Sequence, residues 1–249
     1  MKALTVFYDT GQDWRQMLKV LETSWEQYHD IPLQVVKQDP PDKKSVAYGL
    51  DTNTDKLSLW QVHFDQDTIF LDCDMLIKGN LVEGFEEISD IGYTTRRDPS
   101  GFPFNAGVIF ARHTSYSQEF MAEWVRVNGL LYADTDLRNK WAQVVPGINQ
   151  PALAKMMAEG WEIDPLPDIY NMCDIRYWKQ AKAVHVKSRI RNLMFGQHVR
   201  YKSNDEKELY DLFWSHLGGP SPEITRRISR RVLIENTRRR RRIRRKPKK

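Results

Sequence analysis

The stretch Thr68–Ile77, TIFLDCDMLI, places two carboxylates, Asp72 and Asp74, directly after an apolar run. A buried carboxylate without a partner is so costly that it normally takes up a proton. The sequence must therefore supply a metal ion, a lysine or arginine, or water at the end of a strand. Residues two apart in an extended chain point to the same side, so we expect both carboxylates to face one site.

Position separates this Asp-x-Asp pair from two others with the same spacing. Asp65-Gln66-Asp67 precedes the apolar run, and Asp134-Thr135-Asp136 falls in a predicted loop. Ligands of open α/β sheets bind outside the carboxyl ends of the strands, which favours Asp72 and Asp74. Two oxygen ligands there suit Mg²⁺ or Mn²⁺ shared with substrate phosphates. The alternative is a pair of solvated acids that end a strand.

Strand patterns alternate with helix patterns on both sides of this stretch. Strands are predicted at 3–8, 33–36, 68–71, 91–94, 107–111 and 181–186, and helices at 14–28, 55–64, 119–127, 150–159 and 207–217. Alternation of this kind predicts an α/β fold with a mostly parallel central sheet.

Composition narrows the class of protein further. The chain has 249 residues, 41% of them hydrophobic, which is enough for a substantial core. Cys73 and Cys173 stand far apart without metal-binding spacing, so neither a disulfide framework nor a zinc site is indicated. No apolar segment is long enough for a signal peptide core or a membrane span. We therefore expect a soluble, cytoplasmic protein.

The charge of the chain changes sign near residue 220. Residues 221–249 contain 14 Lys or Arg and 2 Asp or Glu, a net charge of +12, whereas residues 1–220 have a net charge of −7. We expect a globular domain at 1–220 and a basic helix and tail at 221–249 that is partly disordered when free.

Such a basic tail predicts a polyanionic partner. Counterion release favours nucleic acid, and the lack of interleaved aromatic residues indicates attraction to its backbone. An anionic membrane surface is the alternative, because the tail carries an apolar stripe on its predicted helix, formed by Ile224, Ile228 and Val232.

Several short segments occur in an order that is typical of one enzyme family. They are Lys56–Trp60 (KLSLW), Thr68–Leu81 (TIFLDCDMLIKGNL), Phe104–Val108 (FNAGV), Asn149-Gln150, Leu166–Asn171 (LPDIYN) and Ala183–His185 (AVH). Over roughly residues 1–200, the sequence resembles the retaining glycosyltransferases of family 8, which include glycogenin and bacterial lipopolysaccharide galactosyltransferases. The resemblance implies a GT-A fold and transfer of a sugar, with retention, from a nucleotide-sugar, expected to be a UDP-sugar, to an acceptor hydroxyl.

The resemblance also implies a metal centre. Asp72 and Asp74 would bind Mn²⁺ and the nucleotide-sugar, and His185 would complete the protein's ligands. A nitrogen beside two carboxylates suits Mn²⁺ better than Mg²⁺, although Mg²⁺ stays possible. From residue type alone, His185 would more often be a packed, hydrogen-bonded histidine.

The same resemblance implies the donor-binding residues. They are Tyr8 and Asp9 near the base, Lys56 near the donor, Asn105, Ala106 and Gly107 in the sugar pocket, and Arg191 at the diphosphate. Without the resemblance, Lys56 is a solvated lysine at a helix start, Asp9 a turn acid, and Asn105–Gly107 a turn into a strand.

The chain departs from the family pattern beside the reacting face of the sugar. Gln150 would lie on that face, but Asn149 stands where the family has an acid. An amide cannot act as a carboxylate base or nucleophile, so this departure concerns activity or donor preference. The family's His-x-x-Gly-x-x-Lys pattern appears here as His185-x-x-Ser188-x-x-Arg191, and serine in place of glycine predicts a different loop path.

Three functions follow from these patterns. The first is a metal-dependent glycosyltransferase whose acceptor is modified DNA, as for some phage enzymes, because the tail would hold the polymer. The second is a catalytically degenerate GT-A protein that binds nucleic acid or acts as a scaffold. The third is a metal-dependent phosphohydrolase, since pairs of aspartates at strand ends also serve that chemistry.

Overall fold

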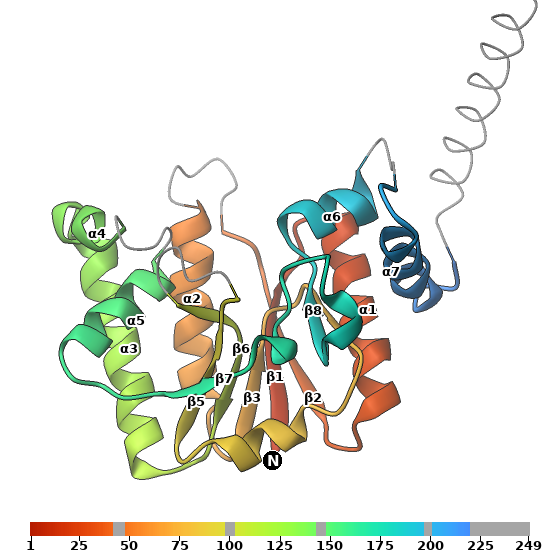
Figure 1. Ribbon diagram of the computed structural model, residues 1–249. Helices are drawn as coiled ribbons and strands as arrows, with labels where there is room; N and C mark the ends of the chain where they lie inside the picture. The colour runs from red at the N-terminus through yellow and green to blue at the C-terminus, as the bar shows by residue number, and fades with distance from the viewer. Residues whose placement is uncertain (42–47, 98–102, 143–147, 197–200, 220–249) are drawn as a thin grey trace, which may run out of the picture. The chain divides into compact units, whose positions relative to one another are not determined.

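The computed structural model describes residues 1–41, 48–97, 103–142, 148–196 and 201–219 (Figure 1). The chain divides into two compact units, Met1–Lys187 and Ser188–Lys249. The basic tail lies outside the described residues, so the predicted boundary at residue 220 and the tail helix stay predictions. None of the helices in the described residues is long and apolar enough to cross a membrane.

The first unit alternates strands and helices, as the sequence predicts. Its elements are β1 (Lys2–Tyr8), α1 (Gln12–Tyr28), β2 (Leu33–Gln38), α2 (Tyr48–Val62), β3 (Thr68–Leu71), β4 (Met75–Ile77), β5 (Ile91–Thr95), β6 (Phe104–Ala111), α3 (Ser115–Ala133), α4 (Thr135–Ala142), α5 (Asn149–Ala158), β7 (Asp164–Leu166) and β8 (Ala183–His185). Short 3-10 helices occur at Val82–Glu87, Asp168–Tyr170 and Trp178–Gln180.

Three sequence predictions need correction at this level. Residues 134–136 do not form a loop, because Thr135 begins α4 and the Asp134 carboxylate accepts from the backbone N–H of Leu137 at 2.9 Å. Lys56 lies in the middle of α2 and not at a helix start, since that helix begins at Tyr48. Asn105–Gly107 is not a turn, because β6 already begins at Phe104.

The central sheet has the order β2-β1-β3-β6-β5-β7. β1 is parallel to β2 and β3, and β5 is parallel to β7, which confirms the mostly parallel sheet. β6 is the exception, because it runs antiparallel to both β3 and β5. The first residues of β6 therefore lie at the same edge of the sheet as the last residues of β3 and β5.

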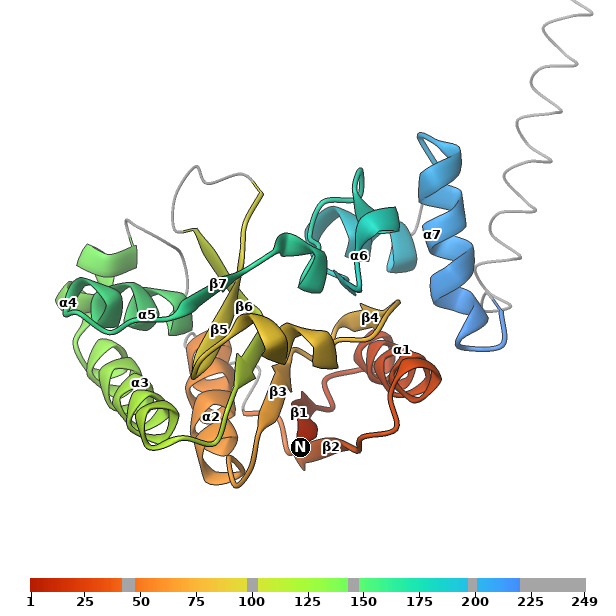
Figure 2. The same cartoon turned by 60° about the horizontal axis from the view of Figure 1, so that its bottom comes forward.

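Alternating side chains divide the core between the two faces of this sheet. From β3, Phe70 packs with α2, α3 and α5 on one face, whereas Ile69 and Leu71 pack with α1 and β4 on the other. Figure 2 shows α2 and α3 on one side of the sheet, with α1 and β4 on the opposite side. Trp60 and Trp124 are fully buried on the first face. Each buried large side chain of this kind contributes about 1.5–3 kcal/mol to folding.

A short second sheet joins distant parts of the first unit. β4 pairs antiparallel with β8, and the register places Met75 opposite His185. The bridge between Met172 and Val184 adds the preceding segment to the same sheet. Because only three residues, 72–74, separate β4 from β3, this pairing brings the end of β8 to the carboxyl end of β3.

The second unit contains α6 (Ser188–Phe195) and α7 (Asn204–Ser215). Aromatic rings pack between its helices; the ring centroids of Phe195 and Phe213, for example, lie 5.5 Å apart. Arg189 forms an ion pair with Glu206, which joins the two helices. Ser188 has a φ of 48°, in the left-handed region where glycine is usual, and the predicted difference in loop path stays a prediction.

Candidate functional site

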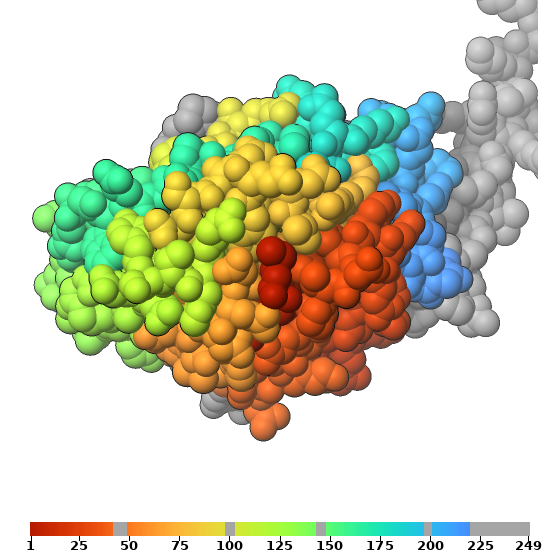
Figure 3. All heavy atoms as spheres, turned by 90° about the horizontal axis from the view of Figure 1, so that it is seen from below, coloured from red at the N-terminus to blue at the C-terminus, as the bar shows by residue number. Residues whose placement is uncertain are grey.

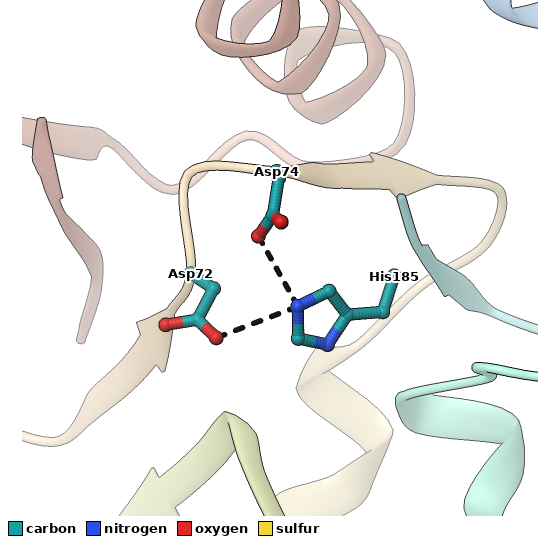
Figure 4. A group of neighbouring side chains, drawn as sticks. All are labelled: Asp72, Asp74 and His185. Carbon is teal, nitrogen blue, oxygen red and sulfur yellow. Dashed lines mark ion pairs between the residues drawn. The ribbon is translucent and has the colours of Figure 1, made fainter. Parts of the chain in front are cut away.

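Asp72, Asp74 and His185 converge at the carboxyl end of β3 (Figure 4). The Nε2 atom of His185 lies 3.1 Å from Asp74 Oδ1 and 3.5 Å from Asp72 Oδ2. One ligand atom from each residue lies within 4.8 Å of the other two. His185 and Asp74 are buried, and Asp72 is partly exposed. The geometry therefore offers two oxygen donors and one nitrogen donor to a single point.

Backbone hydrogen bonds hold this convergence in place. The N–H of Asp72 donates to the carbonyl of Gly107 at 2.9 Å, and the N–H of Val186 donates to the carbonyl of Asp74 at 2.7 Å. Cys73 and Asp74 form a turn between β3 and β4. The two carboxylates do face one site, as predicted, but through this turn and not through an extended chain.

A second layer of contacts fixes the orientation of the His185 ring. Its Nδ1 lies 3.0 Å from Asn171 Oδ1, and the Asn171 amide donates to Thr94 Oγ1 at 3.0 Å. An amide oxygen only accepts, so Nδ1 carries a proton and Nε2 faces the carboxylates. Gly107 allows this position, because a Cβ there would lie 2.5 Å from the ring.

The charge balance of the group favours a cation. Burial lowers the pKa of His185 and so does Lys187, but the charge and hydrogen bond of Asp74 raise it, and the net result is a pKa of about 9. In the absence of a metal, a proton on Nε2 therefore serves as the positive partner of the carboxylates at neutral pH. Two carboxylates and a histidine held by an outer hydrogen bond are a donor set that fits Mn²⁺, and Mg²⁺ less well.

A cavity of about 320 Å³ opens beside this group. Nine of the residues predicted from the sequence line it: Lys56, Asp72, Asp74, Asn105, Ala106, Gly107, Asn149, Gln150 and His185. Asn53, Arg96, Ile148 and Lys187 complete the lining. The sequence prediction therefore assembled most of one site from segments that lie far apart in the chain.

Lysine side chains add positive charge to the metal-binding end of the cavity. Lys56 Nζ lies 2.7 Å from Asp72 Oδ1 and 4.6 Å from the centre of the Trp60 ring. Lys187 Nζ donates to Asn105 Oδ1 at 3.4 Å. Lys56 therefore contacts the group of Asp72, Asp74 and His185 directly, and Lys187 contacts Asn105 in the same cavity lining.

The Asn149 side chain joins two helices. Its amide Nδ2 donates to the carbonyl of Asn53 at 3.1 Å, which links the start of α5 to α2. Its Oδ1 is buried and has no hydrogen-bond partner among the described residues. A carboxylate has no proton to donate, so an acid at this position would lose the contact with Asn53.

Gln150 is held from the opposite side of the cavity. Arg96, which directly follows β5, donates through Nη2 to Gln150 Oε1 at 2.8 Å and through Nε to the carbonyl of Phe104 at 3.0 Å. These two contacts fix both the guanidinium and the side-chain amide.

Three predicted residues are not part of this cavity lining. Tyr8 donates to Asp55 Oδ2 at 2.7 Å. Asp9 pairs with Arg15 at 2.8 Å and lines a different cavity of about 530 Å³ between the ends of β1 and β2 and helix α1. Arg191 belongs to α6 in the second unit. Their roles stay predictions.

Sequence reasoning did not assign roles to Arg96, Asn53 or Asn171. Arg96 follows an apolar strand at its carboxyl end, and that position alone was a usable signal, as it was for Asp72. Asn171 stands inside the LPDIYN segment, but nothing in the segment marks it as the partner of His185. The contact from Asn53 uses a backbone carbonyl, which any residue type would supply.

Comparison with known proteins defines the class of fold. No protein-family model and no curated protein sequence matches the chain. A solved structure of a glycosyltransferase involved in the glycosylation of the major capsid of PBCV-1 aligns with 84% of this chain and 99% of its own, at 13% identity and a TM-score of 0.54. The fold is therefore that of the GT-A glycosyltransferases, as the sequence resemblance implied.

Two further solved structures support this assignment. The glycosyltransferase GlyE of Streptococcus pneumoniae TIGR4 aligns over 89% of this chain and 65% of its own, with 15% identity and a TM-score of 0.56. The galactosyltransferase LgtC, solved with donor and acceptor sugar analogs, aligns over 86% of this chain and 96% of its own, with 11% identity and a TM-score of 0.54. At such identities the likeness concerns the fold.

Proposed function

We propose that this protein transfers a sugar from a nucleotide-sugar to an acceptor hydroxyl, using a divalent cation held by Asp72, Asp74 and His185. The observation that carries the proposal is the convergence of these three side chains at the carboxyl edge of a GT-A sheet, with their ligand atoms within 4.8 Å of one another. Open α/β sheets bind their ligands at that edge.

The metal-binding end of the cavity suits the diphosphate of the donor. Mn²⁺ held there would neutralise negative charge as the nucleoside diphosphate departs. Lys56 and Lys187 line the same cavity and supply positive charge that is in place before the reaction, which favours the transition state. Arg191 is proposed to add a forked contact to the diphosphate, and UDP is the proposed nucleotide, both on the sequence resemblance.

The other end of the cavity suits the sugar. Gln150 lines that end from α5, whereas Asn105, Ala106 and Gly107 line the cavity from β6, with Gly107 beside the His185 ring. We assign Gln150 to orientation of the sugar, because an amide is not a nucleophile or a base. Retention of the anomeric configuration is part of the proposal on the sequence resemblance alone.

The acceptor is proposed from the charge of the tail. Residues 221–249 have a net charge of +12 and would attract a polymer rich in phosphate, with modified DNA as the first candidate. The test compares transfer to hydroxymethylated DNA, at low and high salt, by the full chain and by a chain that ends at residue 220. Equal salt dependence of the two chains would exclude the tail as the DNA-binding segment.

A thermal-shift screen tests the central proposal. UDP, GDP, CDP and ADP are compared with and without Mn²⁺ on the wild type and on His185→Gln, which lacks the ring nitrogen. A ligand at a concentration of 100 times its Kd should stabilise the wild type by about 2.7 kcal/mol. We expect this stabilisation with UDP only when Mn²⁺ is present, and its loss in His185→Gln.

The outcomes separate the functions considered above. The proposal would be rejected if no nucleotide stabilised the protein. It would also be rejected if the stabilisation were the same with and without Mn²⁺ and in His185→Gln. Metal-dependent binding of UDP without transfer to any acceptor would favour a degenerate GT-A protein. Release of the sugar phosphate from a nucleotide-sugar in the absence of an acceptor would favour a phosphohydrolase.

A further inference from the structure

The two ends of the cavity can be told apart, because several of its lining residues come from neighbouring strands whose order in the sheet is known. Asp72 directly follows β3, Asn105 is the second residue of β6 and Arg96 directly follows β5, and these strands are adjacent in the order β3-β6-β5. Neighbouring strands lie about 4.8 Å apart, so Arg96 follows a strand about 10 Å from the one that carries Asp72. If the diphosphate lies at the metal ligands, as the proposed function requires, the sugar lies toward Arg96.

Arg96 is oriented and keeps donor capacity for a ligand. Nε and Nη2 are used by the carbonyl of Phe104 and by Gln150 Oε1, which fixes the plane of the guanidinium. Among the described residues, Nη1 has no hydrogen-bond acceptor. Because Gln150 accepts from Arg96 with its oxygen, its Nε2 also remains a donor. Two donor groups therefore stand together at the sugar end of the cavity.

Negative charge is absent from this end of the cavity lining among the described residues. Among the described residues, the only acidic ones in the whole cavity lining are Asp72 and Asp74, which form the metal group. Asn149, where the related family has an acid, offers one neutral acceptor, Oδ1. A sugar hydroxyl both donates and accepts, whereas a carboxylate only accepts and matches an oriented guanidinium. The lining is therefore better matched to an anionic sugar than to a neutral one.

We propose that Arg96 selects a donor whose sugar carries a carboxylate, that is, a nucleoside diphosphate linked to a hexuronic acid. The inference rests on the proposed function and adds the class of sugar to it. Arg96 would pair with the carboxylate of the sugar while it holds Gln150 against the ring. The neutral Asn149 belongs to the same preference, because a carboxylate there would repel such a donor.

The test measures binding of UDP, UDP-glucose, UDP-galactose, UDP-glucuronate and UDP-galacturonate by calorimetry in the presence of Mn²⁺. The proteins are the wild type, Arg96→Gln, Arg96→Lys and the control Arg97→Gln. Arg97 is the next residue and is also an exposed arginine, but it pairs with Asp168 at 2.6 Å and stacks on Tyr177, and it does not line the cavity.

We expect the wild type to bind one UDP-uronate about 10- to 100-fold more tightly than the matching neutral sugar, the range for a hydrogen bond to a charged group. Arg96→Gln should lose this preference and keep its affinity for UDP, and Arg97→Gln should keep both. Arg96→Lys should keep part of the preference, because the charge remains while the forked geometry is lost.

Several results would overturn the inference. A wild type that binds the neutral sugars as tightly as the uronates rejects it without any variant. If Arg96→Gln lost the same factor of affinity for every UDP-sugar, Arg96 would only position Gln150. Failure of UDP itself to bind with Mn²⁺ would reject the proposed function, and the inference with it. Thermal unfolding of each variant without ligand checks that it is folded.

Discussion

The two ends of β3 carry the same Asp-x-Asp spacing in opposite surroundings. At the carboxyl end, Asp72 and Asp74 converge on the buried ring of His185. At the amino end, Asp65 has a side chain that is 68% exposed and pairs with Lys2 at 2.7 Å. Asp67 there accepts from the backbone N–H of His113 at 2.8 Å.

The difference lies in how many acids share one partner. At the amino end, each acid has a partner of its own and stands at the surface. Figure 3 shows the face of the molecule at this end, with the start of β1 in dark red. At the carboxyl end, both acids turn toward the buried ring of His185, and Lys56 pairs with Asp72 at 2.7 Å in addition. The chain path through β6 and β8 creates this shared site, and the Asp-x-Asp spacing alone does not.

The third pair follows the same rule. Asp134 accepts from a backbone N–H at the start of α4, so a helix terminus is its partner. An Asp-x-Asp spacing is therefore a functional signal only where the fold turns the two acids toward one shared, buried side chain.

The sharpest test of the comparison is a matched pair of substitutions at the two ends of β3. Asp74→Asn should lower Mn²⁺-dependent nucleotide affinity by at least about 100-fold, since loss of a direct ligand should exceed the 10- to 100-fold effect of outer partners. Asp65→Asn should leave that affinity unchanged. Titration calorimetry with Mn²⁺ and UDP measures both. Similar losses in the two variants would contradict the assignment of the site to the carboxyl end.

A second pair of substitutions tests the packing of the ring at the carboxyl end. Alanine at Gly107 would place a Cβ 2.5 Å from the His185 ring and 3.1 Å from Asn171 Nδ2. Both groups would have to move, so we expect metal affinity to fall by about 100-fold, at the upper end of the range for outer partners.

Gly129→Ala is the control for that change. Gly129 lies in α3, and an added Cβ meets nothing within 4 Å. We expect this variant to be about 0.5–1 kcal/mol more stable than the wild type, because alanine favours the helix. Titration with Mn²⁺ measures the metal affinity of both variants, and chemical unfolding measures their stability. Normal Mn²⁺ binding in Gly107→Ala would mean that His185 is not a ligand in its present position.

A smaller effect is expected from the outer partner of the ring. Asn171→Leu keeps side-chain volume but removes the acceptor for His185 Nδ1, so the orientation of the ring is lost. Metal affinity should fall by about 10-fold or more. Asn128→Leu, a buried asparagine on α3, is the control and should change stability without changing metal affinity. Unchanged Mn²⁺ affinity in Asn171→Leu would leave Asn171 only a packing role.

The smallest expected effect is a change in stability from Asp65, at the amino end of β3, and it depends on pH. The hydrogen bond from Lys2 lowers the pKa of Asp65 below 3.8. Its contribution to stability is therefore present above that pH and is lost as the pH falls through the lowered pKa. Because Asp65 is largely exposed, Asp65→Asn should cost at most about 1 kcal/mol at pH 7, and less at pH 3. Urea unfolding at both pH values, with and without Mn²⁺, measures it. A cost that grows toward pH 3 would contradict this account.

Much of the fold and most of the site lining could be predicted from the sequence. The apolar run 68–71 indicated β3, and the rule on carboxyl ends selected Asp72 and Asp74 over the other pairs. Residues 181–186 were predicted as a strand with His185 at its end. These predictions succeeded because apolar runs and strand ends are local features that burial dictates.

Other features of the structure could not be predicted, because they depend on the path of the chain in space. Nothing in Phe104–Ala111 indicates that β6 runs antiparallel, because a fully buried strand has the same pattern in either direction. The contact between Arg96 and Gln150 joins residues 54 positions apart, through side chains that are individually ordinary. The early start of α2 was missed because Tyr48–Thr54 lacks the apolar spacing that identified its second half.

The pairing of β4 with β8 also has a consequence for biosynthesis. During synthesis from the amino terminus, both carboxylates emerge long before His185 and Asn171. A nascent chain that lacks β8 therefore has only two of the three protein ligands, and premature capture of a cation is disfavoured. Once β8 has paired, a bound cation would act as a cross-link that closes a very long loop, the kind of closure that constrains an unfolded chain most. Metal uptake would then report that the first unit has finished folding.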